Sequence, residues 1–235
     1  MEAIFALVFV MIVLLSVAAI GGAIWFAIHR HKREKARRAA LASYVTARGY
    51  GYLPEYNERA QLFVSNPFGL GNNRRALDVV WGAVGGRPFE TFAYRFETQT
   101  TNGQGQTQTQ VHPYQVAWIP MPASVPTMRL TADGAFQRFF AKMGAKDLEV
   151  ESHHFNERWK VWCADERIGH AVLTPALIDF MLAPGWAGRS LVIEGRLLMT
   201  YSKGHTNLTD LEGVVGGLYG FLDQMPKFLF TDQQY

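Results

Sequence analysis

Three features of this sequence predict an α+β fold behind a membrane-spanning helix. The chain begins with a long uncharged apolar run, its middle alternates apolar and polar residues at the period of a strand, and helix-capping residues precede two later segments. Of the 235 residues, 49% are apolar and only 18% are charged. Because soluble domains average about 25% charged residues, we expect part of this chain to avoid water.

The apolar run extends from Ala3 to Ile28, 26 residues without a charge. About 20 apolar residues suffice to cross a bilayer, and a backbone in hydrocarbon must form a helix to satisfy its own hydrogen bonds. A cleaved signal peptide would instead have a basic start, a shorter apolar run and an Ala-x-Ala-like cleavage site. Residues 1–29 are therefore predicted to be the uncleaved transmembrane helix of a single-pass protein.

A basic segment follows the span at once, with Arg30, Lys32, Arg33, Lys35, Arg37 and Arg38. The positive-inside rule places this side of the span, and the domain beyond it, in the cytoplasm, with the N-terminus outside. The segment either sets topology while touching anionic headgroups or is a regulated lipid-recognition patch. Residues 30–49 are expected to continue the helix to about Arg48, with Gly49 as its C-cap.

The charge of the remaining chain argues against a nucleic-acid partner. From residue 39 onward, 17 Lys and Arg stand against 18 Asp and Glu, a net charge of −1. A surface for DNA or RNA would need a basic field over the domain. A single cysteine also excludes an intramolecular disulfide framework and a cysteine-rich zinc site.

Residues 50–235 are predicted to form one cytoplasmic α+β domain of mainly antiparallel sheet. Residues 50–75 are rich in turn formers and are expected to be mainly loop. Three strands in a meander should follow, at 76–84, 89–97 and 114–119, with Gly85-Gly86 as the first hairpin turn. The stretch Thr98–Gln110 contains only Thr, Gln, Gly and Asn, and is expected to be a long mobile hairpin tip.

The second half of the domain mixes strands with three to four helices. Pro120, Pro122 and Pro126 predict a rigid connection to a short strand at 127–130. Further strands are expected at 148–151, 158–163, 191–193 and 196–202. Helices are expected at 133–144, from Thr174 to Leu182, and from a capping box at 209–212 to about Met225.

Several motifs give this chain a resemblance to a known group of proteins. They are the span with its basic tail, the segment Phe155-Asn-x-Arg-Trp-x-Val with Asp165 after it, and the motif Leu173-Thr-Pro-Ala-Leu. With them the chain resembles an uncharacterised family of actinobacterial-type single-span membrane proteins with a cytoplasmic domain of unknown function. The resemblance covers most of residues 44–225 and implies one α+β domain, but no activity.

Residues that could carry chemistry are few. His153 and His154 are adjacent, so on a strand their side chains would point to opposite faces, and we expect no metal site there. Cys163, with Asp165 and His170 nearby, has the residue types of a nucleophilic triad, but its alternating apolar segment favours a buried structural thiol.

Two other groups are candidate sites. Arg74 and Arg75 follow a glycine-containing turn and are the first choice for an anion-binding site, although the P-loop pattern is missing. The last helix carries a small-residue face of Gly213, Gly216, Gly217 and Gly220. It should pack either against the domain's own sheet or against a helix of another protomer.

These observations favour a membrane-anchored, non-enzymatic interaction or scaffold protein at the cytoplasmic face of a bacterial inner membrane. Its partners would be membrane lipids and an unidentified protein or a second copy of the chain. A domain that binds an anionic lipid headgroup or small ligand is the alternative, and a membrane-tethered hydrolase ranks third. No cofactor is expected.

Overall fold

A computed structural model describes residues 2–132, 147–204 and 210–231 of the chain. The chain divides into two compact units, Met1–Arg48 and Gly49–Tyr235. The first unit is the helix α1 (Glu2–Ala47), and the second contains the sheet and the remaining helices.

Helix α1 continues without a break from the apolar run through the basic segment, as the sequence predicts. It ends where Gly49 takes a φ of +69°, a left-handed conformation that glycine adopts without strain. By length and composition α1 is apolar enough to cross a membrane. Membrane anchors and signal sequences both have this character.

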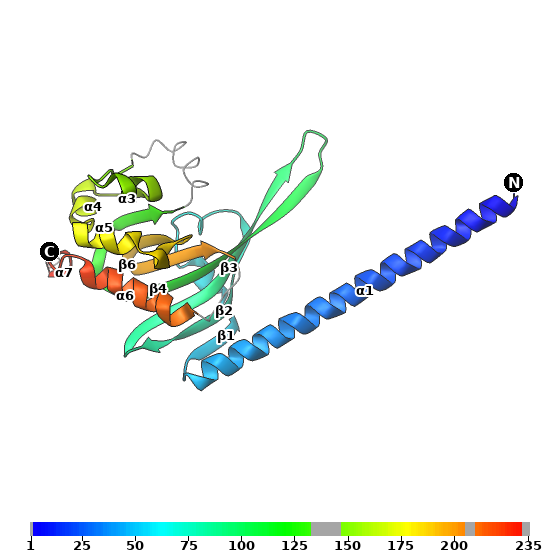
Figure 1. Ribbon diagram of the computed structural model, residues 1–235, viewed down its shortest axis with the longest axis horizontal. Helices are drawn as coiled ribbons and strands as arrows, with labels where there is room; N and C mark the ends of the chain where they lie inside the picture. The colour runs from blue at the N-terminus through cyan, green and yellow to red at the C-terminus, as the bar shows by residue number, and fades with distance from the viewer. Residues whose placement is uncertain (1, 133–146, 205–209, 232–235) are drawn as a thin grey trace. The chain divides into compact units, whose positions relative to one another are not determined.

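The second unit is built on an antiparallel sheet of six strands (Figure 1). The strands pair in the order β1-β2-β3-β4-β5, and β6 pairs with β4. They are β1 (Gly51–Glu55), β2 (Asn72–Val84), β3 (Arg87–Thr101), β4 (Thr107–Thr131), β5 (Lys160–Cys163) and β6 (Ser190–Lys203). The predicted α+β class and antiparallel sheet are confirmed.

Strand β1 lies in the segment that we expected to be mainly loop. Its Gly51 pairs with Trp81 of β2, whose indole lies over the glycine, so that an added Cβ would fall 2.1 Å from a ring atom. Gly82 is covered in the same way by the ring of Tyr50. Glycines weaken a strand signal in sequence, but here each makes room for an aromatic ring that packs over the pair.

The polar stretch Thr98–Gln110 is a pair of strands rather than a loop. The β3–β4 ladder continues from Thr98–Gln110 to Thr101–Thr107 and leaves a turn of only five residues, 102–106. In Figure 1 this ribbon extends beyond the rest of the sheet. The stretch is a hairpin, as predicted, but most of it is paired strand and not loop, because backbone pairing here does not depend on apolar side chains.

Strands β4 and β6 are single bent strands where the sequence suggested separate segments. The prolines at 120, 122 and 126 lie inside β4, where the ladder to β3 has ended at Trp118 and the ladder to β5 starts at Met128. Proline is tolerated where a strand lacks one neighbour. Gly195 has a φ of +59° at a matching irregularity in β6. The bend brings the Thr200 hydroxyl within 2.9 Å of the Ser190 carbonyl, although these residues would lie about 33 Å apart on a straight strand.

The helices of the second unit begin at recognisable caps. Thr174 accepts a hydrogen bond from the amide of Leu177 and opens α5 (Pro175–Leu182), as predicted. Asp165 accepts from two amides and opens α4 (Glu166–Val172), a helix that the sequence analysis missed. Among the described residues, the other helical segments of this unit are η1 (Asn57–Gln61), α3 (His153–Arg158), η2 (Pro184–Trp186), α6 (Leu211–Gln224) and α7 (Phe228–Thr231).

Two predictions in this half need a correction or stay open. Residues 148–151 form no strand, and the Leu148 amide only donates one hydrogen bond to the carbonyl of Val161. The predicted helix at 133–144 and the capping threonine at 209 lie outside the described residues.

The core lies on both faces of the sheet. One face carries an aromatic-rich cluster that includes the predicted period-two rows Phe92, Tyr94, Phe96 and Tyr114, Val116, Trp118, covered by Phe63 and Phe68 from the segment after β1. Helix α6 packs against β2, β4 and β6 (Figure 1).

Candidate functional site

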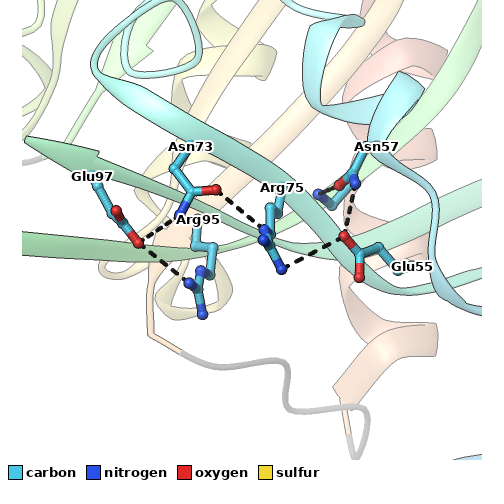
Figure 2. A network of polar contacts seen from close by, with 7 residues as sticks. Glu55, Asn57, Asn73, Arg75, Arg95 and Glu97 are labelled. Carbon is cyan, nitrogen blue, oxygen red and sulfur yellow. Dashed lines mark hydrogen bonds and ion pairs between the residues drawn. The ribbon is translucent and has the colours of Figure 1, made fainter.

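Arg75 belongs to a polar network that joins β1, β2 and β3 (Figure 2). Its Nε donates to Asn73 Oδ1 at 3.2 Å, and its Nη1 lies 3.9 Å from Glu55 Oε1. Asn73 in turn donates to Glu97 Oε1 at 2.8 Å, and Arg95 donates to the same oxygen at 3.3 Å. Arg75 and Arg95 are direct cross-strand partners, a like-charge pair that Glu55 and Glu97 offset. An anionic ligand here would have to compete with two carboxylates.

Arg74 has different partners from its neighbour. Its Nη1 donates to the carbonyl of Phe68 at 3.4 Å, and the Tyr94 hydroxyl donates to the same carbonyl at 2.8 Å. Burial raises the pKa of Tyr94 above its ordinary value, so this hydroxyl keeps its proton. The structure thus does not combine the two arginines into one guanidinium clamp.

In the basic segment of α1, Glu34 pairs with two of the six basic residues. Its Oε1 lies 2.8 Å from Arg37 Nη2 and 2.9 Å from Arg38 Nε. These hydrogen bonds, that of Arg37 most strongly, lower the pKa of Glu34 to about 2. Residues 30–38 therefore carry six cations and one anion on a single helix, and Arg30, Lys32, Arg33 and Lys35 are all exposed.

The four glycines of α6 do not form one packing face against the sheet. The residues of α6 that are buried are larger side chains: Leu211, Val214, Val215, Leu218, Tyr219, Phe221 and Leu222. A Cβ on Gly216 would meet nothing within 4 Å, whereas one on Gly220 would fall 2.8 Å from Phe180 Cζ. Gly217 faces Trp186 at 3.5 Å. Gly217 and Gly220 thus lie against side chains of η2 and α5, whereas a Cβ on Gly213 would meet the Asp210 carboxylate at the start of α6 itself.

The residue types of a nucleophilic triad have structural roles here. Cys163 is buried at the end of β5, and burial raises the pKa of its thiol. The carboxylate of Asp165 is bonded to the amides of Arg167 and Ile168 as the α4 cap. His170 is exposed on α4.

His153 and His154 lie on the helix α3 rather than on a strand. Both are exposed and approach Glu157, His153 at 3.2 Å and His154 at 4.0 Å. In the ranges 2–132, 147–204 and 210–231, no three His, Cys, Asp or Glu side chains come together as a group that could hold a metal ion.

Two buried or clamped carboxylates escaped the sequence analysis. Glu90, only 6% exposed, lies 2.8 Å from Arg59 and accepts a hydrogen bond from the Trp118 indole at 3.2 Å. Glu194 accepts from the amides of Val64 and Ser65, at 3.0 and 3.1 Å. Both fasten the segment after β1 to the sheet. For Glu90, the sequence did contain a signal, because its charge lies inside the mainly apolar segment that starts at Phe89.

A half-open cavity of about 190 Å³ lies where β4 and β6 meet. Its lining has one cation and several hydroxyls: Tyr114, Ala132, Gly188, Ser190, Tyr201, Ser202 and Lys203. Such a lining suits a small polar or anionic group.

Comparison with known proteins gives one informative likeness. No protein-family model and no curated protein matches the sequence. Among solved structures, the fold is similar to the crystal structure of the mycobacterial trehalose monomycolate transport factor A, TtfA, with a TM-score of 0.55. The match covers 79% of this chain and 94% of that one, at 11% sequence identity. At this identity the likeness establishes the fold alone.

Proposed function

We propose that this chain is a membrane-anchored, non-enzymatic accessory protein that holds a protein partner at the cytoplasmic face of the membrane. The process it serves would be the movement of a glycolipid or a related acylated carbohydrate. The fold likeness to a transport factor over most of both chains is the observation that carries this proposal.

The N-terminal helix supports the membrane part of the proposal. Its 26 uncharged residues are long enough to remain in a bilayer, and the segment behind them holds six cations against the single anion Glu34. All of these cations except the half-buried Arg37 are exposed on α1, where they suit contact with anionic headgroups. The same asymmetry favours a cytoplasmic domain.

The polar groups of the domain support an adaptor rather than a catalyst. Asp165 is used as a helix cap, Glu90 and Glu194 fasten a loop, and the thiol of Cys163 is buried with a raised pKa. These groups are committed to the fold, which supports a role in contacts with other molecules rather than in catalysis.

Depletion of the chain in its host, followed by pulse labelling of lipids, tests this proposal. We expect labelled acylated sugars to accumulate in the inner membrane when the chain is depleted. The full chain should restore their movement, as should a variant whose residues 3–28 are replaced by an unrelated span. A variant without any span is the matched control and should fail. Unchanged lipid movement after complete depletion would contradict the role in transport.

A further inference from the structure

The ribbon that extends from the sheet is built only of uncharged polar residues. We call residues 98–110 the polar ribbon; from Gln99 to Gln110 every residue is exposed, and the segment contains no charge and no proline. Its two strands pair with each other through four residue pairs, from Thr98–Gln110 to Thr101–Thr107 (Figure 1).

The β4 side of the polar ribbon offers backbone groups for further pairing. The Asn102 amide donates to the Gln106 carbonyl, so in this ladder the even-numbered residues of β4 bond to β3. The backbone groups of Thr107, Thr109 and Val111 therefore point away from β3. The Pro113 carbonyl confirms this alternation, because it accepts from Gly204 beside β6. Among the described strands, the ladder to β6 reaches β4 only at Tyr114.

Natural proteins protect such an edge with charges, prolines or bulges, because it is a template for another strand. Residues 107–112 carry none of these, and the β3–β4 register is regular here. An unprotected edge of this length is a feature that favours strand addition.

The sequence along this edge matches itself under a two-fold axis. If two copies pair antiparallel about Thr109, Thr109 faces Thr109 of the second copy, Gln108 faces Gln110, and Thr107 faces Val111. Paired threonines, and threonine beside valine, are favourable cross-strand neighbours, and each glutamine amide both donates and accepts. The pattern therefore selects a second copy of the chain over a strand of unrelated sequence.

We propose that the polar ribbon is a homodimerisation arm, in which residues 107–111 of two copies pair antiparallel about Thr109. The three outward residues of each copy would form about six backbone hydrogen bonds. This inference stands independently of the proposed transport role, because it rests only on the geometry and composition of the ribbon.

Thiol cross-linking of the full chain in lipid vesicles tests the proposal. In a Cys163→Ser background, Thr109→Cys should place two thiol-bearing residues with Cα atoms about 5.5 Å apart. The matched control, Thr101→Cys, lies on the same ribbon and is equally exposed, but its two copies would be at least about 14 Å apart. A bifunctional thiol reagent with a reach of about 8 Å should therefore cross-link the first variant to dimers and spare the second.

Three results would overturn the proposal: no dimer with Thr109→Cys, equal cross-linking of both variants, or cross-linking of Thr109→Cys to a different protein in native membranes. A second measurement avoids the cysteines. Thr109→Lys would place two like charges opposite each other and should weaken dimerisation by about tenfold or more, whereas Thr101→Lys should not. Equal dimerisation of the two lysine variants, measured by native mass spectrometry in detergent, would also contradict it.

Discussion

Alanine substitutions at Gly216 and Gly220 of α6 should change stability in different ways, although both glycines lie inside the same helix. At Gly216 an added Cβ meets nothing within 4 Å, so only helix propensity counts. Gly216→Ala should therefore raise the free energy of unfolding by about 1 kcal/mol. For a domain of this size that corresponds to an increase in melting temperature of about 2–4 °C.

At Gly220 the same methyl group falls 2.8 Å from Phe180 Cζ, well inside the optimal carbon–carbon separation. The Phe180 ring is itself in edge contact with Trp186, with ring centroids 5.9 Å apart, so Trp186 blocks its movement on that side. Overpacking of this kind costs about 1–3 kcal/mol, which cancels or exceeds the gain in helix propensity. Gly220→Ala should thus leave stability unchanged or lower it.

Thermal unfolding of the full chain in detergent measures both effects, with Gly217→Ala as a third point. Gly217 has Trp186 at 3.5 Å, an ordinary contact, so its variant should behave like Gly216→Ala. Equal increases in melting temperature for Gly216→Ala and Gly220→Ala would refute the reasoning, because they would show that Phe180 does not restrict the helix.

Three further predictions follow from other contacts. Glu90→Ala should lower the free energy of unfolding by about 1–3 kcal/mol, because it removes the partner of Arg59 and Trp118. Glu90→Gln should lower it less. If the exposed Glu58→Ala had the same effect as Glu90→Ala in denaturant titration, the contacts of Glu90 would have no special role. Arg87 holds the pKa of Asp223 below its ordinary 3.8 through two hydrogen bonds. The wild type should therefore exceed Asp223→Asn in free energy of unfolding by less than about 1 kcal/mol, and this difference should be constant above pH 4 and fade as the pH falls below it. Replacing residues 99–109 by Asn-Gly should cost less than about 1 kcal/mol, because the removed side chains are exposed; loss of the folded state on gel filtration would contradict this.

Local signals made much of the fold predictable. The rows Phe92, Tyr94, Phe96 and Tyr114, Val116, Trp118 alternate in sequence and share one face of the sheet. The Gly85-Gly86 turn and the Thr174 cap also depend only on neighbouring residues, and both are confirmed. These features were accessible because the physics that creates them acts within a few residues.

The strands that sequence reasoning missed are those without an apolar alternation to mark them. Strand β1 contains glycine and proline, and the polar ribbon has no apolar residue, so each is recognisable only through its partner strand. The prolines at 120, 122 and 126 are tolerated in β4 because the ladder to β3 ends before them and the ladder to β5 starts after them. The sequence around these prolines does not show where the neighbouring strands end.

The candidate site was less predictable for the same reason. Arg75 was identifiable as a basic residue beside a turn, but its neighbours Glu55 and Glu97 come from two other strands and depend on the register of the sheet. Likewise, the spacing of the α6 glycines was visible in sequence, whereas the helix face that contacts Phe180 was not.

The central claim is that α1 anchors the chain with its globular unit in the cytoplasm, and one labelling experiment tests it most directly. In a Cys163→Ser background the only native thiol is gone, and Gly103→Cys adds one in the turn of the polar ribbon, where a new Cβ has open space. A membrane-impermeant maleimide should leave this thiol unlabelled in intact cells and label it once the membrane is opened. Replacing the basic residues between Lys32 and Arg38 with glutamate should scramble this result. Strong labelling in intact cells would contradict the cytoplasmic placement and the proposed function with it.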